Sequence, residues 1–311
     1  MVEWIKVFGD PNTQWILLGS ILLGLSSGVI GAFAYLRKQS LMGDALSHAA
    51  LPGICIAFMI TGSKSIVWFL VGAAIAGLIA TLSIGWITRY TKLKQDAALG
   101  IILSVFFGFG IVLLTQIQHS ASGNQSGLDK FLFGQAAAMI RSDVITMSVI
   151  SFVLLGVCTL LFKELKIISF DPGFARGIGM PVGVLDQLVM FLIVIAVVVG
   201  IQAVGVVLMA ALLITPAVAA RYWTERLGLM VILSGLFGAL SGFLGTLIST
   251  SGNNLPTGPI SVLAATTIFI ISILIAPRRG ILPKLWQRFK LRREVQNIPH
   301  QVVAKEGTIY E

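Results

Sequence analysis

The sequence predicts an all-α protein, a polytopic transmembrane helical bundle with about eight or nine spans. Hydrophobic residues make up 56% of the 311 residues and charged residues only 11%, whereas a soluble domain carries roughly 25% charged residues. Several apolar runs exceed the ~20 residues that cross a bilayer. The net charge is +9, but the basic residues lie in short loops between the apolar runs. That distribution is typical of membrane topology and argues against nucleic acid as a partner.

The chain divides into three parts. We expect residues 1–14 to form a polar extracellular lead-in, residues 15–276 to form the transmembrane domain, and residues 277–311 to form a basic cytoplasmic tail. Glu3 and Asp10 precede the first apolar run, so we expect no cleavable signal peptide. Both cysteines lie in apolar segments without metal-ligand or redox spacing, and we interpret them as small buried hydrophobic residues.

The first half of the chain contains four predicted spans. They cover about residues 15–36, 41–60, 65–88 and 97–114. Gly24 and Gly28 in the first span are small residues that let helices approach closely. Pro52 and Gly53 fall inside the second span, and we expect them to kink it.

The second half is less regular. A weakly apolar segment at 116–141 precedes the fifth span, and a polar stretch rich in Gly and Pro follows that span. The apolar region 186–220 is too long for one pass, so we expect two passes, or one pass and a broken helix, turning near residues 200–205. Asp186 begins this region as a helix-start carboxylate. The remaining spans cover about residues 142–162, 227–250 and 260–276.

Lys and Arg predict the orientation. One set of loops, together with the tail, holds 18 of the 22 basic residues. The set comprises residues 37–38, 88–96, 163–184, 221–226 and 277–311. The excess places this set in the cytoplasm. The N-terminus is then outside and the C-terminus inside, which requires an odd number of crossings. Nine fits, and eight stays open if the region 186–220 crosses differently.

Asp44 and His48 stand inside an otherwise apolar run. Their i, i+4 spacing on a helix puts both side chains on one face, about one turn apart. Ionisable groups in a membrane are expensive and usually face a bundle interior or an aqueous pathway. Carboxylate oxygen and imidazole nitrogen are half of a divalent-metal site, which a second copy would complete with four ligands. The alternative is that Asp44 complements the helix dipole while His48 bonds a neighbouring helix.

A second motif lies in the longest predicted cytoplasmic loop. Residues 171–179, Asp-Pro-Gly-Phe-Ala-Arg-Gly-Ile-Gly, read as a short amphipathic element bounded by Pro and Gly. Such an element suits docking into a groove on a soluble partner, and an ordinary surface loop is the alternative. The sequence contains no Gly-x-x-x-x-Gly-Lys-Ser/Thr motif. Another subunit or an ion gradient must therefore supply the energy for any pumping.

Three stretches together resemble a known family. Residues 40–53, Ser-Leu-Met-Gly-Asp-Ala-Leu-Ser-His-Ala-Ala-Leu-Pro-Gly, closely resemble the signature of the metal-cation permeases of bacterial ABC importers for manganese, zinc and ferrous iron. Residues 171–179 are similar to the cytoplasmic coupling segment of that family, within about 170–182. Residues 206–221 are similar to its late core. The resemblance spans residues 15–276 and implies a type II ABC importer-like permease domain.

The resemblance also implies partners and roles. Two permease subunits, expected as a homodimer, would each dock a cytoplasmic ATP-binding subunit, and an extracellular metal-binding protein would deliver the ion. Asp44 and His48 match the positions that hold the cation. Asp171, Ala175 and Gly179 match the segment that couples to the ATPase.

We therefore expect a multi-pass transport subunit of a bacterial inner or plasma membrane, with no permanently bound cofactor. It is not expected to be an enzyme, because no nucleophile accompanies Asp44 and His48. The favoured cargo is Mn²⁺, which carboxylate and imidazole ligands without thiolates suit, and Zn²⁺ and Fe²⁺ remain alternatives. A permease for a siderophore or cobalamin chelate and a stand-alone gradient-driven metal carrier are the other functions left open.

Overall fold

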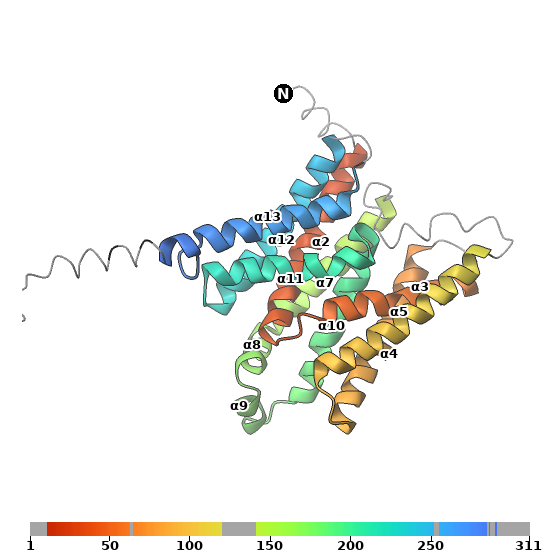
Figure 1. Cartoon of the computed structure of the whole chain (residues 1–311), viewed down its shortest axis with the longest axis horizontal. Coiled ribbons are helices and arrows are strands. Elements are labelled where there is room, and N and C mark those ends of the chain that lie inside the picture. The colour runs from red at the N-terminus through yellow and green to blue at the C-terminus, as the bar shows by residue number, and fades with distance from the viewer. Residues whose placement is uncertain are drawn as a thin grey trace, which may run out of the picture.

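The computed structural model describes residues 11–62, 65–119, 141–251, 255–284, 286 and 290. Most of the lead-in and of the tail lies outside this range, as does most of the segment 116–141. The principal elements of the described part are helices (Figure 1). They are α2 (Pro11–Leu36), α3 (Met42–Thr61), α4 (Ile66–Tyr90), α5 (Gln95–His119), α7 (Arg141–Leu160), α8 (Phe162–Phe170), α9 (Pro172–Gly177), α10 (Val182–Val204), α11 (Val206–Trp223), α12 (Leu227–Ser251) and α13 (Thr257–Ile275).

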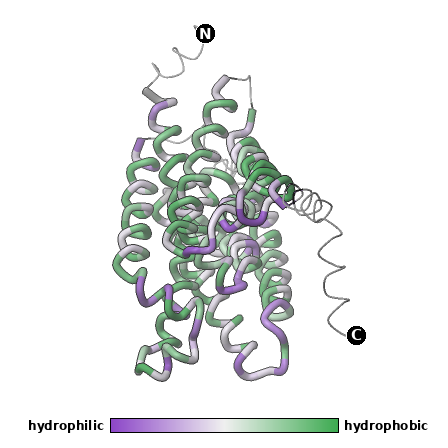
Figure 2. The backbone as a smooth tube through the Cα atoms, turned by 90° about the vertical axis from the view of Figure 1, so that its left-hand side faces the viewer, coloured by the Kyte–Doolittle hydropathy of each residue, from purple (hydrophilic) through white to green (hydrophobic). Residues whose placement is uncertain are grey.

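Eight of the described helices are long and apolar enough to cross a membrane, which confirms the predicted polytopic bundle. Figure 2 shows hydrophobic residues along the lengths of the helices and hydrophilic stretches at turns between them. The remaining apolar helix, α11, is shorter. It follows α10 after a sharp break at Gly205, whose φ of 93° and ψ of 162° lie in a region that residues with side chains rarely adopt. The region 186–220 is thus two helices, as its length predicted.

Helices α2 and α12 pack against each other along much of their length. A methyl group at Gly24 would overlap the backbone of Gly238, and one at Gly28 would overlap the carbonyl of Ser234. The Ser234 hydroxyl also donates to the Gly28 carbonyl at 2.6 Å. Residue numbers rise along α2 from Gly24 to Gly28 while those of their partners on α12 fall from Gly238 to Ser234, so the two helices are antiparallel. Glycine here provides the close helix approach that the sequence predicted for the first span.

One end of the bundle gathers the basic turns, and we name it the Arg37 end. Arg37, just after α2, forms an ion pair with Asp186, which lies one turn into α10. Arg89 and Tyr90, in the last turn of α4, line one pocket together with Gln187, the neighbour of Asp186, so this turn lies at the same end. Trp223, which closes α11, donates through Nε1 to the Ser272 hydroxyl near the end of α13 at 3.0 Å. The loops grouped by charge therefore meet at one end.

Two local expectations differ from the structure. Helix α2 begins at Pro11, so the end of the predicted lead-in is already helical. Helix α3 contains Pro52 and runs as one element to Thr61, and the kink expected at Pro52 stays a prediction. The polar stretch 163–184 is not a loop, because most of it forms α8 and α9. Gly53 serves close packing, since a methyl group there would overlap the backbone of Gly72 on α4.

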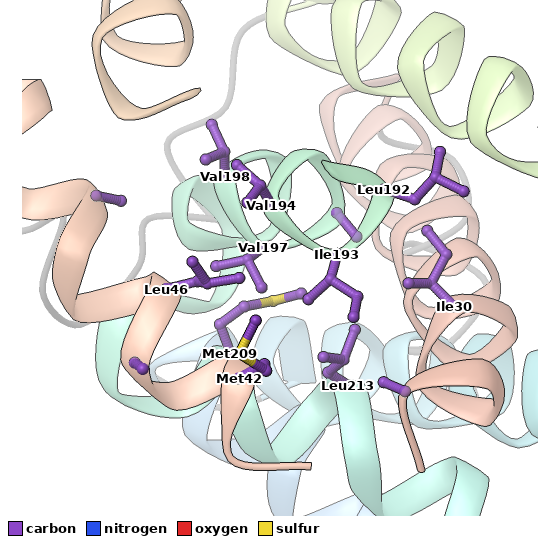
Figure 3. Packing of buried hydrophobic residues seen from close by; sticks show 14 of the residues in the cluster. Ile30, Met42, Leu46, Leu192, Ile193, Val194, Val197, Val198, Met209 and Leu213 are labelled. Atoms are coloured by element: carbon purple, nitrogen blue, oxygen red, sulfur yellow. The ribbon is translucent and has the colours of Figure 1, made fainter. Parts of the chain in front are cut away.

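The core that holds α3 lies between α2, α10 and α11 (Figure 3). Met42 and Leu46 are both at most 1% exposed and point toward α10 and α11, where Met209 and Leu213 face them. Each helical residue turns the chain by about 100°, so a residue two positions along lies on nearly the opposite face. The face that carries residues 44 and 48 is therefore turned away from this core.

Candidate metal site and coupling segment

Asp44 and His48 meet on the face of α3 opposite to its buried core. The Asp44 Oδ1 and His48 Nε2 atoms are 3.5 Å apart. The Asp44 side chain is 44% exposed and the His48 side chain 17% exposed. The predicted helical spacing thus brings a carboxylate oxygen and an imidazole nitrogen together at a partly open position within the bundle.

His48 is positioned by α5. The Phe107 ring meets the imidazole edge-on, with ring centroids 4.7 Å apart and an interplanar angle of 76°. Helix α5 is held close to α3 at this level, because a methyl group at Gly110 would press on Leu51 and Pro52. The buried Nδ1 of His48 has no hydrogen-bond partner among the described residues. Packing, rather than a fixed hydrogen bond, therefore sets the ring orientation.

The two donor atoms are spaced as two ligands of one cation would be. Ligand atoms ~2.1 Å from an ion and separated by a tetrahedral angle lie ~3.4 Å from each other. The observed separation between Oδ1 and Nε2 is 3.5 Å. Two donors do not complete a coordination shell. Among the described residues, no group of three or more His, Cys, Asp or Glu side chains could hold a metal ion. A cation held by Asp44 and His48 would therefore take its remaining ligands from water, from other kinds of protein atom or from a second chain.

The candidate coupling segment folds as the small helix α9. Asp171 is its N-cap, and the Asp171 Oδ1 accepts a hydrogen bond from the Phe174 backbone amide at 2.8 Å. Pro172 follows in the first turn, where its fixed φ suits a helix start. Gly179 has φ +81°, the left-handed conformation that lets the chain reverse into α10. Asp171 and Gly179 thus define the two ends of this element.

Ala175 lies on the inner side of α9. Its side chain is 0% exposed and belongs to the chain's own buried core. Phe174 is 58% exposed and Ile178 is 53% exposed, so these residues form the accessible apolar face of the segment. Ala175 anchors α9 to the bundle, and its neighbours face outward.

Two side-chain contacts were missed from the sequence. Phe107 lies far from His48 along the chain, and an apolar residue in a predicted span carries no signal of such a contact. Asp186 was interpreted as a helix-start carboxylate, but it pairs with Arg37. The sequence could have indicated this pair, because Arg37 and Asp186 each lie next to an apolar span and both lie on the predicted cytoplasmic side.

Comparison with known proteins identifies the family. The model of the ABC 3 transport family matches residues 10–276. The manganese transport system membrane protein MntC of Bacillus subtilis is 56% identical over 290 residues, which cover 93% of this chain and 66% of that protein. The zinc transport system membrane protein TroC of Treponema pallidum is 47% identical over 285 residues, covering 91% of this chain and 95% of TroC.

A solved structure has the same fold. PsaBC from Streptococcus pneumoniae, in complex with Fab, contains a chain that is 35% identical and superposes with a TM-score of 0.79. The match covers 89% of this chain and 97% of that chain. A family match over most of the length, relatives above 30% identity and a shared fold agree with the resemblance seen in the motifs. The chain belongs to the ABC 3 transport family, and it is a multi-pass membrane transport subunit, not an enzyme.

Proposed function

We propose that this chain is the permease of an ATP-driven importer of divalent metal cations, with Mn²⁺ as the favoured cargo. The observation that carries the proposal is the pair of donor atoms, Asp44 Oδ1 and His48 Nε2, 3.5 Å apart on one face of a transmembrane helix. In a membrane interior such groups are retained when a substrate or ion pathway needs them.

A second, identical chain completes the site in this proposal. Two copies related by an axis along the membrane normal supply two carboxylates and two imidazoles to one cation. The exposed face of α5 beside Phe107 suits that approach. A methyl group at Gly100 or Gly108 would meet nothing within 4 Å, and Ser104 between them is exposed. Small residues at this spacing allow helices of two subunits to come close.

The energy for transport comes from ATP hydrolysis in other subunits, because the sequence of this chain has no P-loop. In the proposed complex, two ATP-binding subunits dock on the exposed face of α9 at the cytoplasmic side, which is the Arg37 end. An extracellular metal-binding protein delivers the cation at the other end. Movement of α9 then opens the metal layer to one side at a time, by alternating access.

The relatives support manganese more than zinc. The relative at 56% identity is named for manganese and the one at 47% for zinc. A set of carboxylates and imidazoles binds either ion, and intrinsic affinity favours zinc. Selectivity for Mn²⁺ must therefore come from geometry, hydration or the delivery protein. Elemental analysis of cells with and without the gene, grown on limiting Mn, Zn or Fe, identifies the cargo: a selective loss of cell Mn supports the proposal, and a selective loss of Zn reassigns it.

The site assignment is tested in proteoliposomes that contain the permease, its ATPase and its binding protein. Asp44→Asn and His48→Gln are expected to reduce ATP-dependent uptake of radioactive Mn²⁺ to background, because each removes a ligand while it preserves shape. Asp96→Asn at the exposed start of α5 and His119→Gln at its exposed end are matched controls and should transport normally. Normal uptake by either site variant would refute the assignment, and uptake without ATP would favour a gradient-driven carrier.

A further inference from the structure

A groove runs between α4 and α10 at the Arg37 end, outside the metal site. Its outer section has a volume of about 550 Å³ and includes Arg89, Tyr90 and Gln187 among its lining residues. Its inner section has a volume of about 300 Å³ and continues along the same two helices. Leu82 and Gln187 line both sections, so the two form one continuous groove.

The outer section is polar, basic and aromatic. Trp86 and Tyr90 are exposed, and their ring centroids lie 5.7 Å apart. The Arg89 Cζ atom lies 6.0 Å from the Tyr90 centroid, and the guanidinium has no carboxylate partner among the described residues. Lys92 and Lys94 follow on the exposed turn after α4. Aromatic side chains beside Lys and Arg are typical of the level where lipid headgroups lie.

The inner section is apolar and reaches into the membrane. Leu78, Leu188, Phe191 and Val194 line it. From Arg89 to Leu78, α4 advances about 17 Å at 1.5 Å per residue. That length is close to half of the ~30 Å hydrocarbon core, which is the depth of one lipid leaflet. The groove therefore has a cationic mouth at headgroup level and an apolar channel of acyl-chain length.

From this arrangement we infer that the α4/α10 groove is a binding site for one anionic phospholipid. The phosphate lies against Arg89 with Lys92 and Lys94 nearby, and an acyl chain occupies the channel beside Phe191. Basic pockets between helices at the membrane surface are the sites where anionic headgroups bind. The groove between α3 and α4 offers a contrast, because its lining from Gly53 to Ile79 contains no charged residue.

Glycine at position 85 keeps the mouth open. Gly85 lines the outer section, and a methyl group there would meet no atom within 4 Å. A leucine at this position would fill headgroup space without disturbing the packing of α4. Gly156 on α7 is equally open, and it supplies the matched control at a site far from the groove in sequence and not part of its lining.

The test uses the full chain in nanodiscs with a photoactivatable phosphatidylglycerol that carries a diazirine on its acyl chain. A phosphatidylcholine with the same chain is the comparison. We expect phosphatidylglycerol to label peptides that contain Leu78 or Phe191 more than phosphatidylcholine does. Arg89→Gln should lower that labelling about fivefold, the effect of one basic residue near an anionic surface, and Gly85→Leu should also lower it. Lys166→Gln on α8 and Gly156→Leu should leave the labelling unchanged.

Three results would overturn the inference. Equal labelling by the two lipids would show that the groove does not select an anionic headgroup. Labelling by phosphatidylglycerol that survives both Arg89→Gln and Gly85→Leu would place the lipid elsewhere. In the same nanodiscs, a bifunctional amine-reactive crosslinker that joins Lys92 or Lys94 to a second chain would show that a protein covers the groove. Arg89 is exposed, so its variant is expected to fold and remains informative if Gly85→Leu does not.

Discussion

The orientation of single side chains on α3 decides what this helix can do. Residues 42 and 46 are buried in the core, and residues 44 and 48 lie nearly opposite on the same helix. The sequence pattern predicted the pairing of Asp44 with His48 because an i, i+4 relation is local. It did not predict the contact with Phe107, because that contact depends on how α5 packs.

The two side chains of the Arg37–Asp186 ion pair differ in burial, so loss of either charge should affect stability differently. The Arg37 side chain is 10% exposed and the Asp186 side chain 37% exposed. Asp186→Asn leaves a buried guanidinium without its counter-charge, whereas Arg37→Gln leaves a carboxylate with access to water. We expect Asp186→Asn to lower the thermal unfolding temperature more than Arg37→Gln does, and Arg37→Met with Asp186→Leu to recover much of the loss. Equal losses in the two single variants would show that burial of the arginine does not matter.

Variants of the neighbouring residues Phe174 and Ala175 should affect ATPase docking and protein stability separately. Phe174→Ala removes an exposed apolar contact, so we expect weaker co-purification of the ATPase with an unchanged unfolding temperature. Ala175→Leu inserts a larger side chain into a fully buried site, so we expect a loss of about 1–3 kcal/mol of stability. Affinity pull-down and thermal unfolding measure the two effects. A Phe174→Ala variant that binds the ATPase normally would move the docking surface elsewhere.

At the scale of elements, the transmembrane helices were predictable and the short ones were not. Hydropathy locates spans because each must bury about 20 apolar residues in lipid. Helix α8 buries only Leu165 and Ile168, so its polar composition predicted a loop. The length of the apolar region predicted a turn near residues 200–205, and the break lies at Gly205. Its exact position depends on the backbone conformation, which no periodicity reveals.

The α2/α12 contact predicts strong intolerance of side chains at its glycines. Gly238→Ala would place a methyl group on the Gly24 carbonyl, with backbone atoms on both sides that cannot yield without moving a helix. We expect a loss of about 1–3 kcal/mol, measured as a lower unfolding temperature in detergent. Gly156→Ala should be neutral, since nothing lies within 4 Å of the added methyl. Equal stability of the two variants would mean that the helices can separate at little cost.

At the scale of the whole molecule, the limiting fact is the number of ligands. One chain brings two donor atoms together at Asp44 and His48, and its described part offers no third acidic, histidine or cysteine ligand at that place. The sequence predicted this half-site from the i, i+4 spacing of Asp44 and His48 in one apolar run. If two copies share one cation, damage to either copy damages the only site in the complex.

Mixed dimers test that sharing directly. Two differently tagged permeases, one wild type and one His48→Gln, are co-expressed, and tandem purification isolates the complex that contains one of each. If each copy carried its own pathway, the mixed dimer would retain half of the wild-type uptake of Mn²⁺. A shared site loses a ligand whichever copy is altered, so we expect uptake far below half, close to that of the doubly altered dimer. A mixed dimer of wild type with His119→Gln controls for tagging and assembly and should transport fully. Half-activity in the His48→Gln mixture would show that each chain completes its own site, with water or another group in place of the second copy.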